Sequence, residues 1–178
     1  MKEMIKKQAK SFSYAIKGIL SVFKTEAHMR FHLVAAIYVI FFGAKFYNLG
    51  SAQWAVLILT ILSVLVTEIF NTALERLCDT VTKEYSANIK FIKDISAGAV
   101  LLAALSAVAI AFVMLFRVDV FSYILFYYSR QIISLIVLLL TVVVAVAFVA
   151  IKPEKYKNYI ENLKNKTQKS STDEKDEV

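Results

Sequence analysis

Four polar residues with side chains suited to chemistry recur at helical spacing in the middle of the chain: Glu68, Asn71, Glu75 and Asp79. At 100° per residue, Asn71, Glu75 and Asp79 fall within about 60° of Glu68 around a helix. Glu68 and Asn71 still lie in an apolar run long enough to cross a membrane, where an acid costs about 2.5–3.5 kcal/mol. This pattern predicts a functional site. The alternative is a solvated helix end that happens to be acidic.

The composition predicts the environment in which these acids sit. The chain has 178 residues, of which 58% are hydrophobic, and a mean hydropathy of +0.61. Soluble domains are about 45–50% apolar, so the sequence indicates an integral membrane protein. One proline and four glycines favour helices throughout. We therefore predict an all-α bundle of transmembrane helices. Its single cysteine, Cys78, cannot form an internal disulfide.

The hydrophobic pattern predicts the order of the elements. We expect an amphipathic surface helix over residues 4–24, and membrane spans over 31–47, 52–75, 95–116 and 132–151. A polar connection over 76–94, an interfacial aromatic segment over 117–130, a short helix over 155–166 and disorder over 167–178 complete the pattern. Ala99, Ala103 and Ala107 recur every fourth residue, which is typical of a helix-packing face. The expected divisions are a membrane domain over 1–118, an additional transmembrane helix over 119–152 and a charged tail over 153–178.

The distribution of basic residues predicts the topology. The net charge is +7, and six lysines precede the first span. The positive-inside rule then puts both termini in the cytoplasm. No nucleic-acid motif accompanies this charge, and no cleavable signal peptide is evident. The topology gathers six charged residues near the cytoplasmic face: Glu26, Glu68, Glu75, Asp79, Lys93 and Asp94.

The spacing of these residues suggests a division of labour. Glu68 and Glu75 lie about 10 Å apart along a helix axis, so they are poorly placed to share one ion. The deeper Glu68 could take a proton from a lipid hydroxyl at the interface. Glu75 could pair with Glu26 around Mg²⁺ and a nucleotide, because Mg²⁺ is usually held by one or two carboxylates plus phosphate. Lys93 could contact phosphate, and Asn71 could donate to phosphate or orient Glu68.

The segment Glu68-x-x-Asn71-Thr72-Ala73-Leu74-Glu75-x-x-x-Asp79 resembles the signature of the small prokaryotic diacylglycerol kinases, which include the undecaprenol kinases. Three further segments are similar to that family: 11–18, Thr25-Glu26-Ala27, and 93–100. The resemblance covers roughly residues 8–116. The fourth span and the charged tail lie outside the family's common three-span core.

The resemblance implies a homotrimer in the bacterial cell membrane that transfers the γ-phosphate of ATP to a lipid alcohol. Glu68 would be the catalytic base, and Glu26 with Glu75 would bind Mg²⁺. The nucleotide-binding residues would be Tyr14, Glu26, Asn71, Glu75, Lys93 and Asp94. The lipid is either diacylglycerol or undecaprenol, with a lean toward undecaprenol.

Two other classes of protein remain as alternatives. A small transporter or channel could use intramembrane acids for an ion pathway, usually near the midplane of the bilayer. A non-catalytic scaffold would account for the alanine face and the surface helix, but leaves Glu26, Glu68 and Glu75 without a role. The clustering of the acids toward one membrane face favours the kinase.

Overall fold

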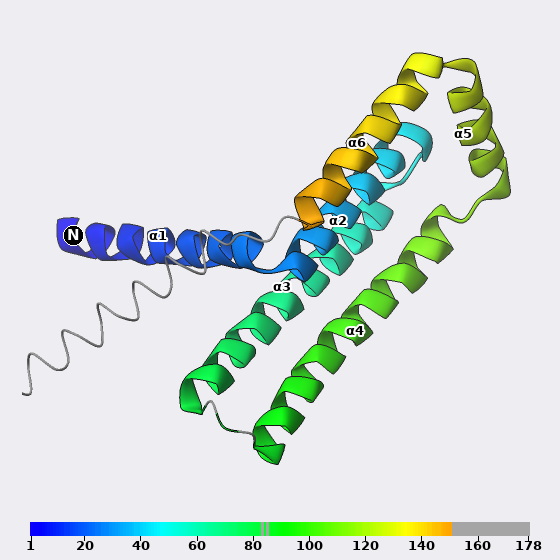
Figure 1. Cartoon of the computed structure of the whole chain (residues 1–178). Coiled ribbons are helices and arrows are strands. Elements are labelled where there is room, and N and C mark those ends of the chain that lie inside the picture. The colour runs from blue at the N-terminus through cyan, green and yellow to red at the C-terminus, as the bar shows by residue number, and fades with distance from the viewer. Residues whose placement is uncertain (83, 85, 151–178) are drawn as a thin grey trace, which may run out of the picture. The chain divides into compact units, whose positions relative to one another are not determined.

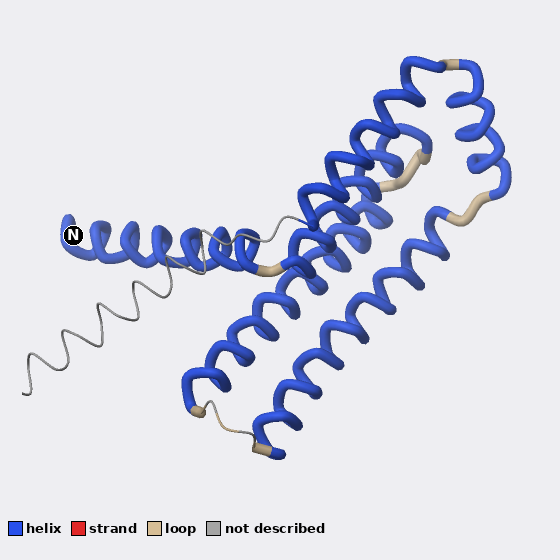
Figure 2. Tube along the Cα trace, in the orientation of Figure 1, coloured by secondary structure: helices blue, strands red, loops and turns tan. Residues whose placement is uncertain are grey.

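A computed structural model describes residues 1–82, 84 and 86–150, and the elements in this part of the chain are all α-helices (Figures 1 and 2). They are α1 (Lys2–Thr25), α2 (Ala27–Phe46), α3 (Ser51–Val81), α4 (Ala87–Leu115), α5 (Val118–Arg130) and α6 (Ile132–Ala150). The described residues form two compact units, one with α1 and the other, His28–Val149, with α2 to α6. Each unit is described by itself.

The four predicted spans are confirmed as helices long and apolar enough to cross a membrane: α2, α3, α4 and α6. The polar connection predicted over 76–94 was wrong in its extent, because α3 continues to Val81 and α4 begins at Ala87. Charged and polar residues can continue a helix beyond the apolar run, because their side chains are solvated there. The predicted interfacial segment is the short helix α5. The predictions for 155–166 and 167–178 lie outside the described residues.

The helix α3 carries a narrow buried face along most of its length. Its start is stabilised by Gln53, whose Oε1 accepts a hydrogen bond from the backbone N–H of Gly50 at 2.8 Å. The buried positions recur every three or four residues along most of the helix, as one helical face requires: Leu57, Thr60, Val64, Glu68, Thr72 and, beyond them, Cys78. The same face that packs in the apolar half of α3 therefore presents Glu68 further along.

The helices α3 and α4 form an antiparallel hairpin, with their backbones side by side (Figure 1). The burial of the alanines on α4 shows whether the predicted alanine face packs within this hairpin. Ala103 and Ala107 are partly buried, whereas Ala99 is exposed. Ser96, one turn before Val100, is the buried residue of this helix. The face that α4 uses within this chain is thus rotated away from Ala99.

A close contact joins α2 to the start of α3. Gly43 is buried, and a Cβ added to it would lie 3.3 Å from Cη2 of Trp54 and 3.5 Å from Cδ1 of Leu49. The glycine therefore lets the indole pack directly on the helix backbone. At the same end, the hydroxyl of Tyr47 donates a hydrogen bond to the carbonyl oxygen of Leu115. These contacts connect the end of α2 to both helices of the hairpin.

The helices α5 and α6 pack beside α2. The ring of Phe46 contacts the rings of Tyr123, Tyr127 and Tyr128 on α5, with centroid separations of 5.5–6.3 Å. Arg117 precedes α5 and pairs with Asp119 at 2.8 Å. This hydrogen-bonded guanidinium holds the pKa of the Asp119 carboxyl below its ordinary value. None of the residues of α6 is buried, as expected of a helix that faces lipid.

The contact between Gly43 and Trp54 predicts how α2 tolerates side chains. Gly43→Leu would force the indole out of its position, and overpacking of this kind costs about 1–3 kcal/mol. We expect a lower melting temperature in detergent and a shift in fluorescence emission, because Trp54 is the single tryptophan of the chain. Gly98→Ala is the matched control, since a Cβ there meets nothing within 4 Å. It should preserve the emission and the melting temperature. Unchanged emission in Gly43→Leu would contradict the contact.

Candidate active site on the α3–α4 hairpin

The side chain of Asn71 connects the two helices of the hairpin. Its Nδ2 donates a hydrogen bond to Oε1 of Glu75 at 3.0 Å, one turn further along α3. Its Oδ1 accepts from the hydroxyl of Ser96 on α4 at 2.7 Å. A carboxylate oxygen only accepts hydrogen bonds, so Glu75 determines which way the amide points. Asn71 therefore holds Glu75 with one end and α4 with the other.

Ser96 is the anchor on α4. The residue is 6% exposed, and its Oγ also lies within hydrogen-bonding distance of the carbonyl oxygen of Lys93, at 2.9 Å. The hydroxyl has one proton, so it is shared between this carbonyl and the Asn71 amide. Lys93 lies one turn before Ser96 on α4. The hydrogen bond between Ser96 and Asn71 therefore also positions Lys93 relative to α3.

A second bridge lies one turn beyond Glu75, toward the end of the hairpin. The Nζ of Lys93 contacts Oδ1 of Asp79 at 2.5 Å. The two side chains are 35% and 65% exposed, so water screens this pair and it contributes little to stability. Separating the two side chains therefore has a small energetic cost.

Glu68 lies deeper in the same face of α3, about two turns from Glu75. It is 3% exposed, between Val64 and Thr72 on the buried face. The predicted acidic face is therefore confirmed as one helical face, with a buried acid at one end and exposed polar groups at the other. This graded burial is what a site that joins a membrane-embedded reactant to a water-soluble one requires.

The remaining predicted residues fall in different places. Asp94 is exposed on α4 beside Lys93. Tyr14 and Glu26 belong to the unit that contains α1. Tyr14 is 59% exposed, and Glu26 ends α1 with extended backbone, its Oε1 accepting from Thr25 Oγ1 at 2.9 Å. The roles predicted for these residues stay predictions.

The donor set limits the kind of metal site. Among residues 1–82, 84 and 86–150, no group of three or more His, Cys, Asp or Glu side chains gathers closely enough to hold an ion. Mg²⁺ commonly takes only one or two carboxylates and completes its shell with water and phosphate, and the Mg²⁺ site expected at Glu26 and Glu75 stays a prediction. One carboxylate oxygen of Glu75, Oε1, accepts the hydrogen bond from Asn71.

Sequence reasoning missed two features of the site. Ser96 was not among the predicted site residues, yet it is the hydrogen-bond partner of Asn71. The ion pair of Lys93 with Asp79 was not predicted either, and the phosphate contact expected of Lys93 stays a prediction. The signal for Ser96 was its spacing, since position i+3 from Lys93 lies on the same face of a helix.

Comparisons with known proteins identify the family of this chain. The family model described as prokaryotic diacylglycerol kinase matches residues 13–115, more than half of the chain. The chain belongs to the prokaryotic diacylglycerol kinase family. The matched range ends at Leu115, the last residue of α4, and leaves α5 and α6 outside it. The protein is thus a multi-pass member of this membrane kinase family, and its α3–α4 hairpin lies within the shared part.

Two relatives carry names for different lipids. A diacylglycerol kinase of Synechocystis sp. is 42% identical over 101 residues, which cover 56% of this chain and 57% of the relative. An undecaprenol kinase of Bacillus subtilis is 35% identical over 91 residues, which cover 51% of this chain and 73% of the relative. The match therefore spans little more than half the length of the Synechocystis relative.

The bridge from Ser96 to Asn71 predicts the stability of the hairpin. Ser96→Ala removes the donor and leaves the amide oxygen of the partly buried Asn71 without its partner on α4, at a cost of about 0.5–1.5 kcal/mol. We expect a lower free energy of unfolding in a detergent titration. Ser106→Ala is the control, because the exposed Ser106 hydroxyl donates only within its own helix, to Leu102. Equal stability of the two variants would show that the bridge contributes nothing.

Proposed function

We propose that this protein transfers the γ-phosphate of ATP to the hydroxyl of a membrane lipid, at the cytoplasmic surface of a bacterial cell membrane. The observation that carries the proposal is the gradient along one face of α3. Glu68 is 3% exposed within the apolar part of the helix, and Asn71 and Glu75 follow it toward the exposed Lys93–Asp79 pair. Membership of the prokaryotic diacylglycerol kinase family supports the same activity.

Glu68 is the proposed catalytic base. Its carboxylate takes the proton of the lipid hydroxyl as the hydroxyl oxygen attacks the γ-phosphorus of ATP. The bond between the γ-phosphorus and the bridging oxygen breaks, and ADP leaves with its electron pair. The products are the lipid phosphate, ADP and the proton on Glu68, which returns to water. An acid buried in the apolar part of α3 suits a substrate whose hydroxyl stays at the membrane interface.

The proposed nucleotide site lies at the exposed end of the same face. Glu75 and Glu26 would bind Mg²⁺, which neutralises phosphate charge when bound with the nucleotide. Asn71 keeps Glu75 in position through their 3.0 Å hydrogen bond. Lys93, beside Asp94, exchanges its partner Asp79 for phosphate oxygens. Tyr14 would contact the nucleotide from the unit that contains α1.

The substrate lipid, the assembly and the topology are part of the proposal. The names of the two relatives support diacylglycerol or undecaprenol as the acceptor. We propose a homotrimer of a core formed by residues 1–118, with 119–152 as an additional membrane helix and 153–178 as a charged tail. The lysines before the first span support cytoplasmic termini, which put Glu68 and Glu75 near the cytoplasmic leaflet.

The direct test is transfer of label from γ-labelled ATP to lipid in mixed micelles, with diacylglycerol and undecaprenol in separate reactions. Glu68→Gln retains the shape of the side chain and removes its basicity, so turnover should fall by about 10²–10⁴-fold. Affinity for ATP should change little. Glu84→Gln is the control, since Glu84 is exposed outside the helices, and it should retain the activity of the parent. Normal turnover in folded Glu68→Gln would exclude this residue as the base.

The proposed metal site predicts a distinct phenotype. Glu75→Gln and Glu26→Gln remove a negative charge from the Mg²⁺ ligands, so half-maximal activity should require about tenfold more Mg²⁺. The measurement is a Mg²⁺ titration of lipid phosphorylation at fixed ATP, with Glu84→Gln again as the control. If the curves of both variants overlay that of the parent, these carboxylates do not bind the metal.

A further inference from the structure

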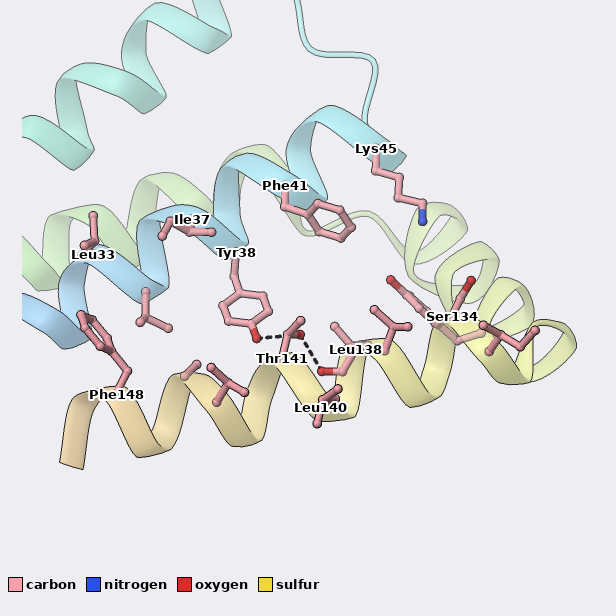
Figure 3. A pocket seen from close by; sticks show the side chains of 16 residues that line it. Leu33, Ile37, Tyr38, Phe41, Lys45, Ser134, Leu138, Leu140, Thr141 and Phe148 are labelled. Carbon is pink, nitrogen blue, oxygen red and sulfur yellow. Dashed lines mark hydrogen bonds between the residues drawn. The ribbon is translucent and has the colours of Figure 1, made fainter. Parts of the chain in front are cut away.

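An open cavity of about 730 Å³ lies between α2 and α6, and none of its lining residues belongs to α3 (Figure 3). Its walls are almost entirely apolar, and α5 contributes Tyr128 at one end. In Figure 3, Leu33 and Phe148 lie at one end of this groove and Lys45 at the other. The groove is lined by α2 and by two helices that lie outside the family match, so it depends on the added part of the chain.

Two polar contacts hold the walls in an antiparallel arrangement. At one end, Nη2 of Arg30 donates a hydrogen bond to the carbonyl oxygen of Val149 at 3.1 Å. Near the middle, the hydroxyl of Tyr38 donates to Oγ1 of Thr141 at 3.1 Å (Figure 3). These contacts join α2 and α6 without filling the space between them. The groove is therefore a built feature of this pair of helices.

The end of the groove near α5 carries a positive charge. The ammonium of Lys45 lies 4.5 Å from the ring centroid of Tyr127 and 5.4–5.9 Å from those of Phe41, Phe46 and Tyr128. Hydrogen bonding to Lys45, and then to Ser134, lowers the pKa of the Tyr127 hydroxyl. No carboxylate among the described residues forms a salt bridge with Lys45. The rings hold the ammonium in place, and its charge is available to an anion from the membrane interface.

The length of the groove matches one leaflet of a bilayer. Twelve residues separate Leu33 from Lys45, which corresponds to about 18 Å of helix. Half of the hydrocarbon core of a bilayer is about 15 Å thick. One acyl chain can thus lie along the groove while its head group reaches Lys45. Lys45 is near the start of α3, whereas Glu75 is near its end, so this head group lies in the leaflet opposite the proposed active site.

We propose that this groove binds an anionic glycerophospholipid, with one acyl chain between α2 and α6 and the phosphate at Lys45. A cation at the end of an apolar groove favours this ligand, because a phosphate complements the charge of Lys45 and an acyl chain complements the apolar walls. The proposal stands independently of the kinase activity.

The test uses tryptophan fluorescence in vesicles. Trp54→Phe removes the single tryptophan, and Phe41→Trp places a new one in the wall of the groove. Vesicles contain increasing fractions of either brominated phosphatidylglycerol or brominated phosphatidylcholine, whose bromines quench nearby indoles. We expect phosphatidylglycerol to be preferred about fivefold at the groove, as one lysine near a membrane surface predicts. Adding Lys45→Gln should reduce the preference to about one, whereas Lys45→Arg should preserve it.

Phe112→Trp in the same Trp54→Phe background reports on ordinary lipid contact. Phe112 is 59% exposed near the end of α4, at the same end of the hairpin as the start of α3. Both lipids should quench this tryptophan equally. If the preference for phosphatidylglycerol is the same in the Phe41→Trp and Phe112→Trp proteins, the proposal is overturned. This comparison does not depend on any Lys45 variant. Protection of the groove tryptophan from both lipids would also overturn it, because another segment or a second copy would then fill the groove.

Discussion

One amide side chain connects the two helices on which the proposed site depends. Asn71 accepts a hydrogen bond from Ser96 of α4 and donates one to Glu75 of α3. The partly exposed Lys93–Asp79 pair also joins α3 and α4, whereas apolar contacts between the helices tolerate sliding and rotation. The bridge through Asn71 determines which turn of α4 faces Glu75, and it therefore determines where Lys93 lies. A polar contact between two largely apolar helices thus sets the register of the site.

The membrane environment explains why the proposed site on α3 contains few polar residues. Each polar group in the apolar part of a span is costly unless it is paired, so polar residues there are expected to be few and functional. On α3 they share a face with Leu57 and Val64, which pack against neighbouring helices rather than toward lipid. The face changes from apolar to charged along its length. A lipid hydroxyl and a water-soluble nucleotide can meet along such a face.

The sequence predicted the helices well, because an apolar run of span length has few alternatives to a helix. It predicted the ends less well. The segment 76–94 was expected to be a connection, but Val81 ends α3 and Ala87 begins α4, since charged residues can extend a helix into water. The helical face of Glu68, Asn71 and Glu75 followed from 3.6-residue periodicity alone.

Contacts between helices could not be predicted in the same way. The pairing of Asn71 with Ser96 depends on the register of two helices whose contacting residues are 25 positions apart. The orientation of the alanine face depends on the same register, and Ala99 proved to be exposed. The groove between α2 and α6 needed both the antiparallel pairing and the position of Lys45. Local sequence patterns carry no information on such long-range alignments.

The most direct test of the account is a double-mutant cycle on ATP-dependent lipid phosphorylation. The cycle compares the parent, Ser96→Ala, Glu75→Gln and the double variant by kcat/KM at limiting Mg²⁺. If Ser96 acts on Glu75 through Asn71, the Ser96→Ala change should have little further effect on kcat/KM in the Glu75→Gln variant. The fold-loss of kcat/KM in the double variant should then be clearly smaller than the product of the two single fold-losses. Losses that simply multiply, or a parent that labels no lipid at all, would contradict the account.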